Sequence, residues 1–185
     1  MKKLNKQKES AQKKDSVNHI SRLNDFFINS LQEMYYAENA ISVAFINIKD
    51  QISTTTLNEI LQTHFEIHLK HKERLEKIFQ LKNERINNKN CTAINALLSE
   101  GKDHLSLFND DKPNWEIALI LLSQKLAHYK IATYGGLAHL AINLKYHQAA
   151  TFLAFSVQEE EEFIAHNLNG IIDTFLTSHI EGYKK

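Results

Sequence analysis

The chain has 185 residues, with 22 basic and 22 acidic side chains, one proline and five glycines. This length suits one domain with a substantial core, and the balanced charge argues against a protein that binds polyanions over its whole surface. The scarcity of proline and glycine leaves few residues for the tight turns of an all-β protein, so we expect a mostly helical chain.

The single cysteine, Cys91, excludes an intrachain disulfide and fits a reducing compartment. The longest apolar run, residues 117–122, is too short to cross a membrane, and no apolar segment follows the lysine-rich N-terminus as it would in a secretory signal. We therefore expect a cytoplasmic protein without a membrane partner.

Residues 1–16 carry six lysines against one glutamate and one aspartate. With one large apolar residue, this segment is predicted to be a disordered basic tail, followed by a folded domain over 17–178 and a short C-terminal tail over 179–185. The basic tail is either a solvated segment without a role or an arm that makes weak contacts with nucleic acid, because clustered lysines gain affinity by releasing counterions.

A helix is expected from about residue 18 to 49, because its apolar residues recur at steps of three and four. This apolar stripe consists of Leu23, Phe27, Leu31, Met34, Ile41 and Phe45. Glu38 lies in the middle of the stripe. Since a buried carboxylate is costly unless it is paired, protonated or bound to a metal, Glu38 indicates a polar site inside the protein.

A second helix is expected from about residue 56 to 81. Thr56 and Glu59 have the spacing of a capping box, which satisfies free amides at a helix start. One face of this helix carries His64 and His71 among apolar residues, and His68 follows His64 at one turn. After a polar, turn-prone stretch, residues 91–100 are predicted to form a short helix that crosses between the two halves of the protein.

A third helix is expected from about 113 to 143, with Pro113 near its start, where the missing amide hydrogen costs little. A fourth is expected from about 147 to 175, and its apolar stripe contains Glu160. Four long amphipathic helices with a short helix in the crossover between the second and third predict an all-α four-helix bundle.

The inward polar set suggests a metal site. Glu38, His64 and Glu160 are the candidate ligands, with His68 and His128 as further candidates. The alternatives are a core histidine with one hydrogen bond and, for the glutamates at 159–162, an ordinary solvated face. Two buried carboxylates that face each other must share a proton, pair with a histidine or bind a cation. Without a metal, we expect Glu38 to pair with His64 or to share a proton with Glu160.

Five motifs resemble those of the YciE/YciF stress-response ferritin-like proteins, over residues 23–172. EMYYAENAI at 33–41 resembles L-x-D-x-Y-x-A-E, and THFEIHLKHKERLEKIF at 63–79 resembles H-L-x-E-T…R-L-E-x-V-F. CTAINALLSE at 91–100 is similar to C-x-A-M-x-G-L-I-x-E, and QKLAHYKIATYGGL at 124–137 to Q-K-x-E-H-Y-E-I-A-x-Y-G-x-L. AATFLAFSVQEEEEFI at 149–164 resembles A-A-x-L-L-x-x-T-L-x-E-E-x-x-T-D.

The resemblance implies a ferritin-like bundle with a two-metal carboxylate site, a role in stress responses, and a homodimer or pairing with a related ferritin-like protein. Glu38, His64 and Glu160 (or Glu159) stand at matching positions. The remaining family carboxylates are replaced, in the order of the helices, by Ile67, Ala127 and Ile164.

A second alignment of the second helix is possible. Shifting it by one turn would place His68 on the family histidine and His71 on the family glutamate, but this shift needs a four-residue deletion inside a helix. We prefer the ungapped alignment.

These replacements put hydrocarbon where anionic ligands would be. A two-metal centre needs roughly four carboxylates, so we expect no ferroxidase activity and either no metal or a single divalent ion, namely zinc, iron or manganese. One hypothesis is a non-catalytic structural or interaction module with a degenerate site. The other is a metal-binding protein, mononuclear or with a di-iron or dimanganese centre, that has an oxidase or storage role.

Overall fold

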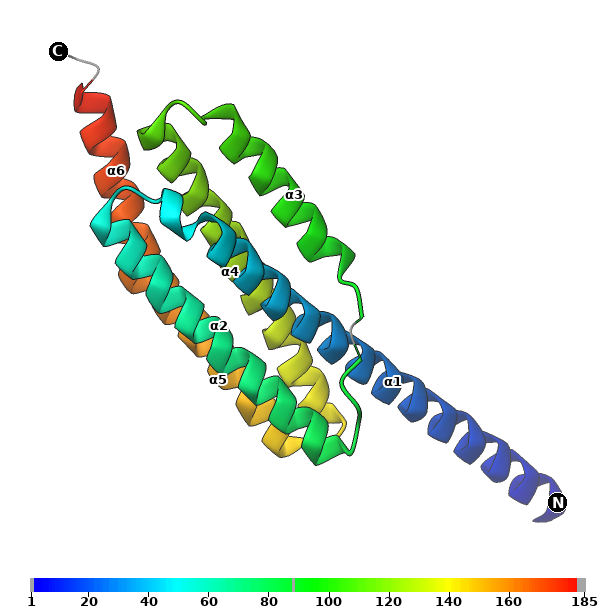
Figure 1. Ribbon diagram of the computed structural model, residues 1–185. Coiled ribbons are helices and arrows are strands. Elements are labelled where there is room, and N and C mark those ends of the chain that lie inside the picture. The colour runs from blue at the N-terminus through cyan, green and yellow to red at the C-terminus, as the bar shows by residue number, and fades with distance from the viewer. Residues whose placement is uncertain (1, 88, 183–185) are drawn as a thin grey trace.

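The protein is a four-helix bundle in the computed structural model, which describes the backbone of residues 2–87 and 89–182 and the side chains of residues 19–87 and 89–177 (Figure 1). The long helices are α1 (Lys2–Ile48), α2 (Thr55–Lys82), α4 (Lys112–Asn143) and α5 (His147–Phe163). A π-helical turn (Ile164–Leu168) and α6 (Asn169–Gly182) continue the fourth helix, and a 3-10 turn (Lys49–Gln51) follows α1. The short helix α3 (Thr92–Leu107) lies in the crossover between α2 and α4, as predicted.

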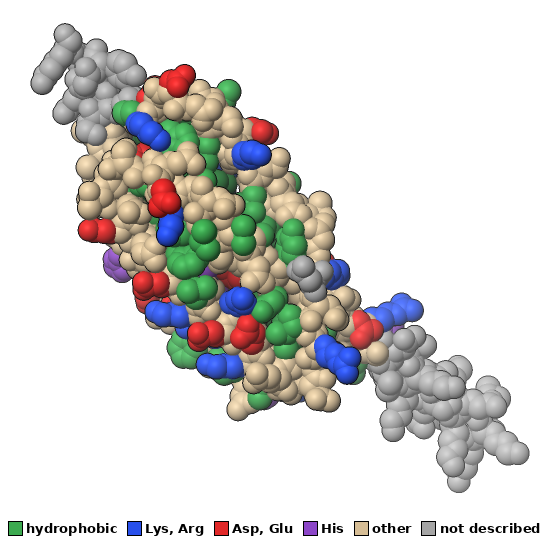
Figure 2. Space-filling view, viewed as in Figure 1, with side chains coloured by type: hydrophobic (Ala, Val, Ile, Leu, Met, Phe, Trp, Pro, Cys, Tyr) green, Lys and Arg blue, Asp and Glu red, His purple; other side chains and the backbone are tan. Residues whose placement is uncertain are grey.

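The helices pack lengthwise. α5 lies against α2 and α4, while α1 lies against α2, α3 and α4. None of the helices in the described part of the chain is both long and apolar enough to cross a membrane. On the face shown in Figure 2, acidic and basic side chains are intermixed, with apolar side chains between them.

The two predicted tails, residues 1–16 and 179–185, lie largely outside the described side chains. The helix α1 begins at Lys2 and extends beyond the other helices in Figure 1, but the side chains of residues 1–18 lie outside the described ones. The side chains of 178–185 also lie outside them. The boundaries at residues 16 and 178, and the disorder of the N-terminal segment, therefore stay predictions.

The core consists of apolar clusters separated by one polar layer. One cluster includes Phe27 of α1, Leu75 of α2 and Leu153 of α5. Another, further along the bundle, includes Leu61 of α2 and Phe163 of α5. Along each long helix, the residues of one cluster come before a buried polar residue and those of the other cluster come after it. The sequence therefore places one polar layer across the middle of the bundle.

The start of α2 differs from the prediction. The helix begins at Thr55, and its N-cap residue Thr54 makes no capping bond with its own side chain, so the capping box expected at Thr56 and Glu59 is wrong. Glu116 of α4 takes this role instead. Its Oε1 accepts hydrogen bonds from the backbone amides of Ser53 at 2.7 Å and Thr54 at 2.9 Å, and both hydroxyls also donate to this carboxylate.

Replacing Glu116 by alanine should therefore destabilise the protein. Burial raises the pKa of Glu116, but the hydrogen bonds from Thr54 and Ser53 outweigh it and lower the pKa. Loss of these bonds leaves two amides without their acceptor, at a cost of about 1–3 kcal/mol in the free energy of unfolding, measured by urea titration at pH 7. E59A is the matched control, because Glu59 is exposed and should change the stability little. Equal losses in both variants would contradict this assignment.

Candidate metal centre

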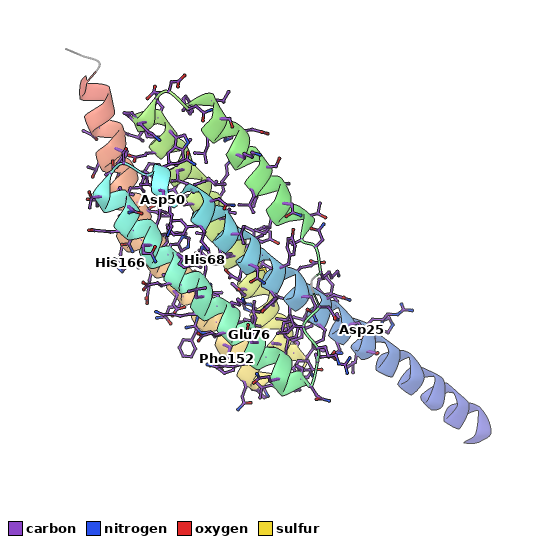
Figure 3. The ribbon with its side chains drawn as sticks, in the orientation of Figure 1. Asp25, Asp50, His68, Glu76, Phe152 and His166 are labelled. Atoms are coloured by element: carbon purple, nitrogen blue, oxygen red, sulfur yellow. The ribbon has the colours of Figure 1, made fainter. Side chains whose placement is uncertain are left out.

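The polar layer contains side chains from all four long helices. His68, labelled in Figure 3, lies in the interior of the bundle, and each residue of the layer is at most 4% exposed. The layer consists of Glu38 from α1, His64, His68 and His71 from α2, Lys130 from α4, and Glu160 from α5. The structure thus brings together four of the five predicted ligand candidates.

Glu38 is held by groups that the sequence did not assign to it. The Tyr134 hydroxyl donates to Glu38 Oε1 at 2.6 Å, and His68 Nδ1 lies 2.8 Å from Oε2. His71 Nδ1 lies 3.3 Å from Oε1. The predicted partners of Glu38, a hydrogen bond with His64 or a proton shared with Glu160, are therefore wrong.

Glu160 pairs with His64 instead. Glu160 Oε2 lies 2.9 Å from His64 Nε2, and the His64 ring is stacked on Phe163 with its centroid 3.9 Å away. Oε1 accepts a hydrogen bond from Lys130 and lies 3.5 Å from His71 Nδ1. Since Phe163 and Glu160 are on the same helix, α5 fixes both the position and the partner of the His64 ring.

Lys130 is the residue of this layer that sequence reasoning missed. Its side chain is fully buried, and its Nζ contacts both carboxylates as well as His68 Nδ1. A signal was present, because Lys130 lies one turn before the buried Tyr134. In the third-helix motif quoted above, the position of Lys130 is also a glutamate, so this replacement reverses a charge at the site.

The remaining predicted positions are apolar or lie elsewhere. Ala127 and Ile164 are buried in an apolar cluster, and Ile67 packs against it. His128 is exposed and lines a surface groove between α3 and α4, so it does not belong to the site. It lies on the outer side of α4, one residue away from the buried Ala127.

Two further polar residues, Glu159 and Arg74, connect the layer to the surface. His71 Nε2 lies 3.1 Å from Glu159 Oε2, and Arg74 donates to both oxygens of Glu159, which is partly exposed. Burial raises the pKa of Glu159, but the hydrogen bonds from Arg74 and His71 outweigh it and lower the pKa to about 2. Glu159 is thus an ion-pair partner of Arg74 and not an inward ligand.

The charges of the layer follow from these contacts. Burial raises the pKa of Glu38 and of Glu160, but the nearby Lys130 ammonium outweighs it and holds both values well below the usual range. Burial lowers the pKa of His64, and burial together with the charge of Lys130 lowers that of His68 to about 3. At neutral pH the layer therefore combines two carboxylates with neutral His64 and His68.

A two-metal centre does not fit these residues. The layer has two carboxylates where such a centre needs roughly four, and the Lys130 ammonium contacts both of them. A single ion fits better, because ligand atoms of His64, His68 and Glu160 lie within 4.8 Å of one another and are of the types that bind Zn²⁺.

The stability of the protein should fall as the pH drops below about 6.5, the ordinary value for histidine. Because the folded-state pKa of His68 is depressed to about 3, the unfolded chain binds a proton in this range that the folded chain does not. His64 acts in the same direction. The loss from His68 should be at most ~1.4 kcal/mol per pH unit.

H68N tests this source of the pH dependence. The asparagine Oδ1 can replace Nδ1 as an acceptor but does not titrate, so the free energy of unfolding should fall less steeply between pH 6.5 and 5 than in the unmodified protein. H128N is the control, because His128 is exposed and outside the layer. Urea titrations at several pH values give the slopes, and equal slopes for H68N and the unmodified protein would refute the assignment.

Comparison with known proteins agrees with this architecture. The family with the description "Domain of unknown function (DUF892)" matches residues 22–180. Protein YciF of Escherichia coli (strain K12) is 29% identical over 144 residues, which cover 77% of this chain and 86% of YciF.

The crystal structure of the E. coli stress protein YciF matches with a TM-score of 0.77 at 28% identity, covering 84% of this chain and 97% of that one. YcfI of Rhodopseudomonas palustris, for which a structural role is suggested, matches with a TM-score of 0.75 at 29% identity, covering 80% and 92%. The predicted resemblance to the YciE/YciF proteins is confirmed, and the chain belongs to the DUF892 family.

Proposed function

We propose that this protein is a non-catalytic, stress-associated member of its family that acts as a structural or interaction module. The observation that carries the proposal is that protein groups already occupy the two buried carboxylates, those of Glu38 and Glu160. All four of their oxygens contact protein groups: Tyr134 at Glu38 Oε1, Lys130 at both Glu38 Oε2 and Glu160 Oε1, and His64 at Glu160 Oε2.

These contacts support a protein without a ferroxidase centre. Such a centre holds two ions through several free carboxylate oxygens and keeps open positions for oxygen. Here the ammonium of Lys130 already compensates carboxylate charge, and hydrocarbon fills the positions of Ile67, Ala127 and Ile164. The relatives support the broader assignment, since YciF of E. coli is a stress protein.

The proposal includes partners and location. The family resemblance supports a homodimer or a pair with a related ferritin-like protein, and the single cysteine supports the cytoplasm. The lysine-rich residues 1–16 would make a weak contact with nucleic acid. Loss of a gel shift at low salt after removal of this segment would support that contact.

A single-ion protein is the second candidate, favoured by the cluster of His64, His68 and Glu160. His64 and His68 are one turn apart on α2, the spacing at which two imidazoles bind one Zn²⁺ from the same face of a helix. Because Lys130 contacts Glu160 and His68, an ion at this place must compete with the ammonium.

Elemental analysis of the untagged full-length protein distinguishes the two candidates. After incubation with Fe²⁺, Mn²⁺ or Zn²⁺ and dialysis, we expect a metal-to-protein ratio near zero and no acceleration of Fe²⁺ oxidation over buffer. A ratio near one that is lost in H64A would establish the second candidate. A ratio near two for iron or manganese, with oxidase activity, would contradict both the proposal and our interpretation of the replaced ligands.

A further inference from the structure

We infer that Lys130 is a tethered cation that takes the place of a metal ion in this bundle, and that removing its ammonium opens a site for one divalent ion. This inference rests on the proposed function, because it explains why the unmodified site has no need of a metal. It concerns the latent binding capacity of the layer, which the proposed function does not address.

The surroundings of the ammonium resemble a coordination sphere. Three acceptors converge on Lys130 Nζ: His68 Nδ1 at 2.6 Å, Glu38 Oε2 at 3.3 Å and Glu160 Oε1 at hydrogen-bond distance. An ammonium has three N–H donors and no acceptor. The number of donors thus equals the number of acceptors, and the acceptors come from three different helices.

His68 shows that the cation holds these acceptors together. Its Nδ1 lies within hydrogen-bond distance of both Lys130 Nζ and Glu38 Oε2. Since the ammonium can only donate, Nδ1 accepts from it and cannot also donate to Glu38. Two lone-pair atoms, His68 Nδ1 and Glu38 Oε2, therefore face each other at 2.8 Å with the same cation as their common partner. A metal ion holds the lone-pair atoms of its ligands close together in the same way.

A fourth atom that could bind a metal ion lies next to these three acceptors. His71 Nδ1 is buried and has no hydrogen-bond partner among the described residues, and it lies 3.3 Å from Glu38 Oε1 and 3.5 Å from Glu160 Oε1. Two carboxylates with one or two imidazoles form a donor set that suits Zn²⁺ or Mn²⁺. Such an ion would also carry more positive charge than the ammonium that it replaces.

An ordinary buried ion pair makes a different prediction. Removing the lysine from such a pair leaves an unpaired charge and a less stable protein, without a new binding property. Removing a tethered cation from a preformed set of ligands should instead give a protein that gains an ion and is stabilised by it.

The variants K130A and K130Q separate these outcomes, since glutamine retains two N–H donors without the charge. K125A is the matched control, because Lys125 is an exposed lysine on the same helix with its own ion pair to Glu100 at 3.0 Å. Each full-length protein is incubated with ZnCl₂ or MnCl₂, dialysed and analysed for metal. We expect about one additional ion per chain in K130A and K130Q relative to the unmodified protein and K125A.

The thermal midpoint gives a second measurement. At a free Zn²⁺ concentration ~100-fold above Kd, Tm of K130A should rise by roughly 5–10 °C, while Tm of K125A should not change. Adding E160Q to K130A replaces an anionic carboxylate ligand by a neutral amide, so the double variant should lose the additional ion.

Equal metal content in K130A, K130Q and the unmodified protein would overturn the inference. Failure of both variants to fold even with ZnCl₂ present would also overturn it, because the ion should then restore the missing cation. Iron or manganese at a ratio near two in the unmodified protein would contradict the proposed function and, with it, the replacement of a metal by Lys130. Unchanged metal content in the variants of a metal-free protein would overturn the inference alone.

Discussion

Two carboxylates buried in the middle of one helical bundle are the constraint on which this structure depends. Transfer of each ionised group from water into the interior costs several kcal/mol unless a cation and hydrogen-bond donors compensate it. Glu38 and Glu160 are both fully buried, and Lys130 is the buried side chain whose charge holds both of them ionised. Tyr134 and His64 supply the remaining hydrogen bonds to the carboxylate oxygens.

This network also constrains how the helices pack. The members of the polar layer come from all four long helices, with apolar clusters on either side of the layer. A slip of one helix along its neighbours would move a charged group into an apolar cluster, and an unpaired buried charge costs about 3–5 kcal/mol. The polar layer therefore favours one register of the bundle, whereas apolar side chains alone would tolerate repacking more easily.

The fold and part of the site could be predicted because helical periodicity reports which residues face inward. Glu38, His64 and Glu160 were found in this way, and all three are in the layer. Partners across the bundle are not encoded in periodicity, so Glu38 was paired with the wrong histidine. Lys130 was missed because lysine is normally solvated. The start of α2 was misassigned for a similar reason, since Glu116 approaches it from a helix about sixty residues later in the chain.

The replacements in this chain act together. Ile67, Ala127 and Ile164 remove negative charge from the positions at which related proteins are expected to hold ligands, and Lys130 adds a positive charge between the two carboxylates that are left. Each change alone would leave the interior with unbalanced charge, but the combination approaches balance without a metal. A bundle that requires a bound ion has a stability that depends on the free concentration of that ion. A cation attached to the chain is always present, so a fold that is compensated in this way, as we propose, would not depend on metal supply.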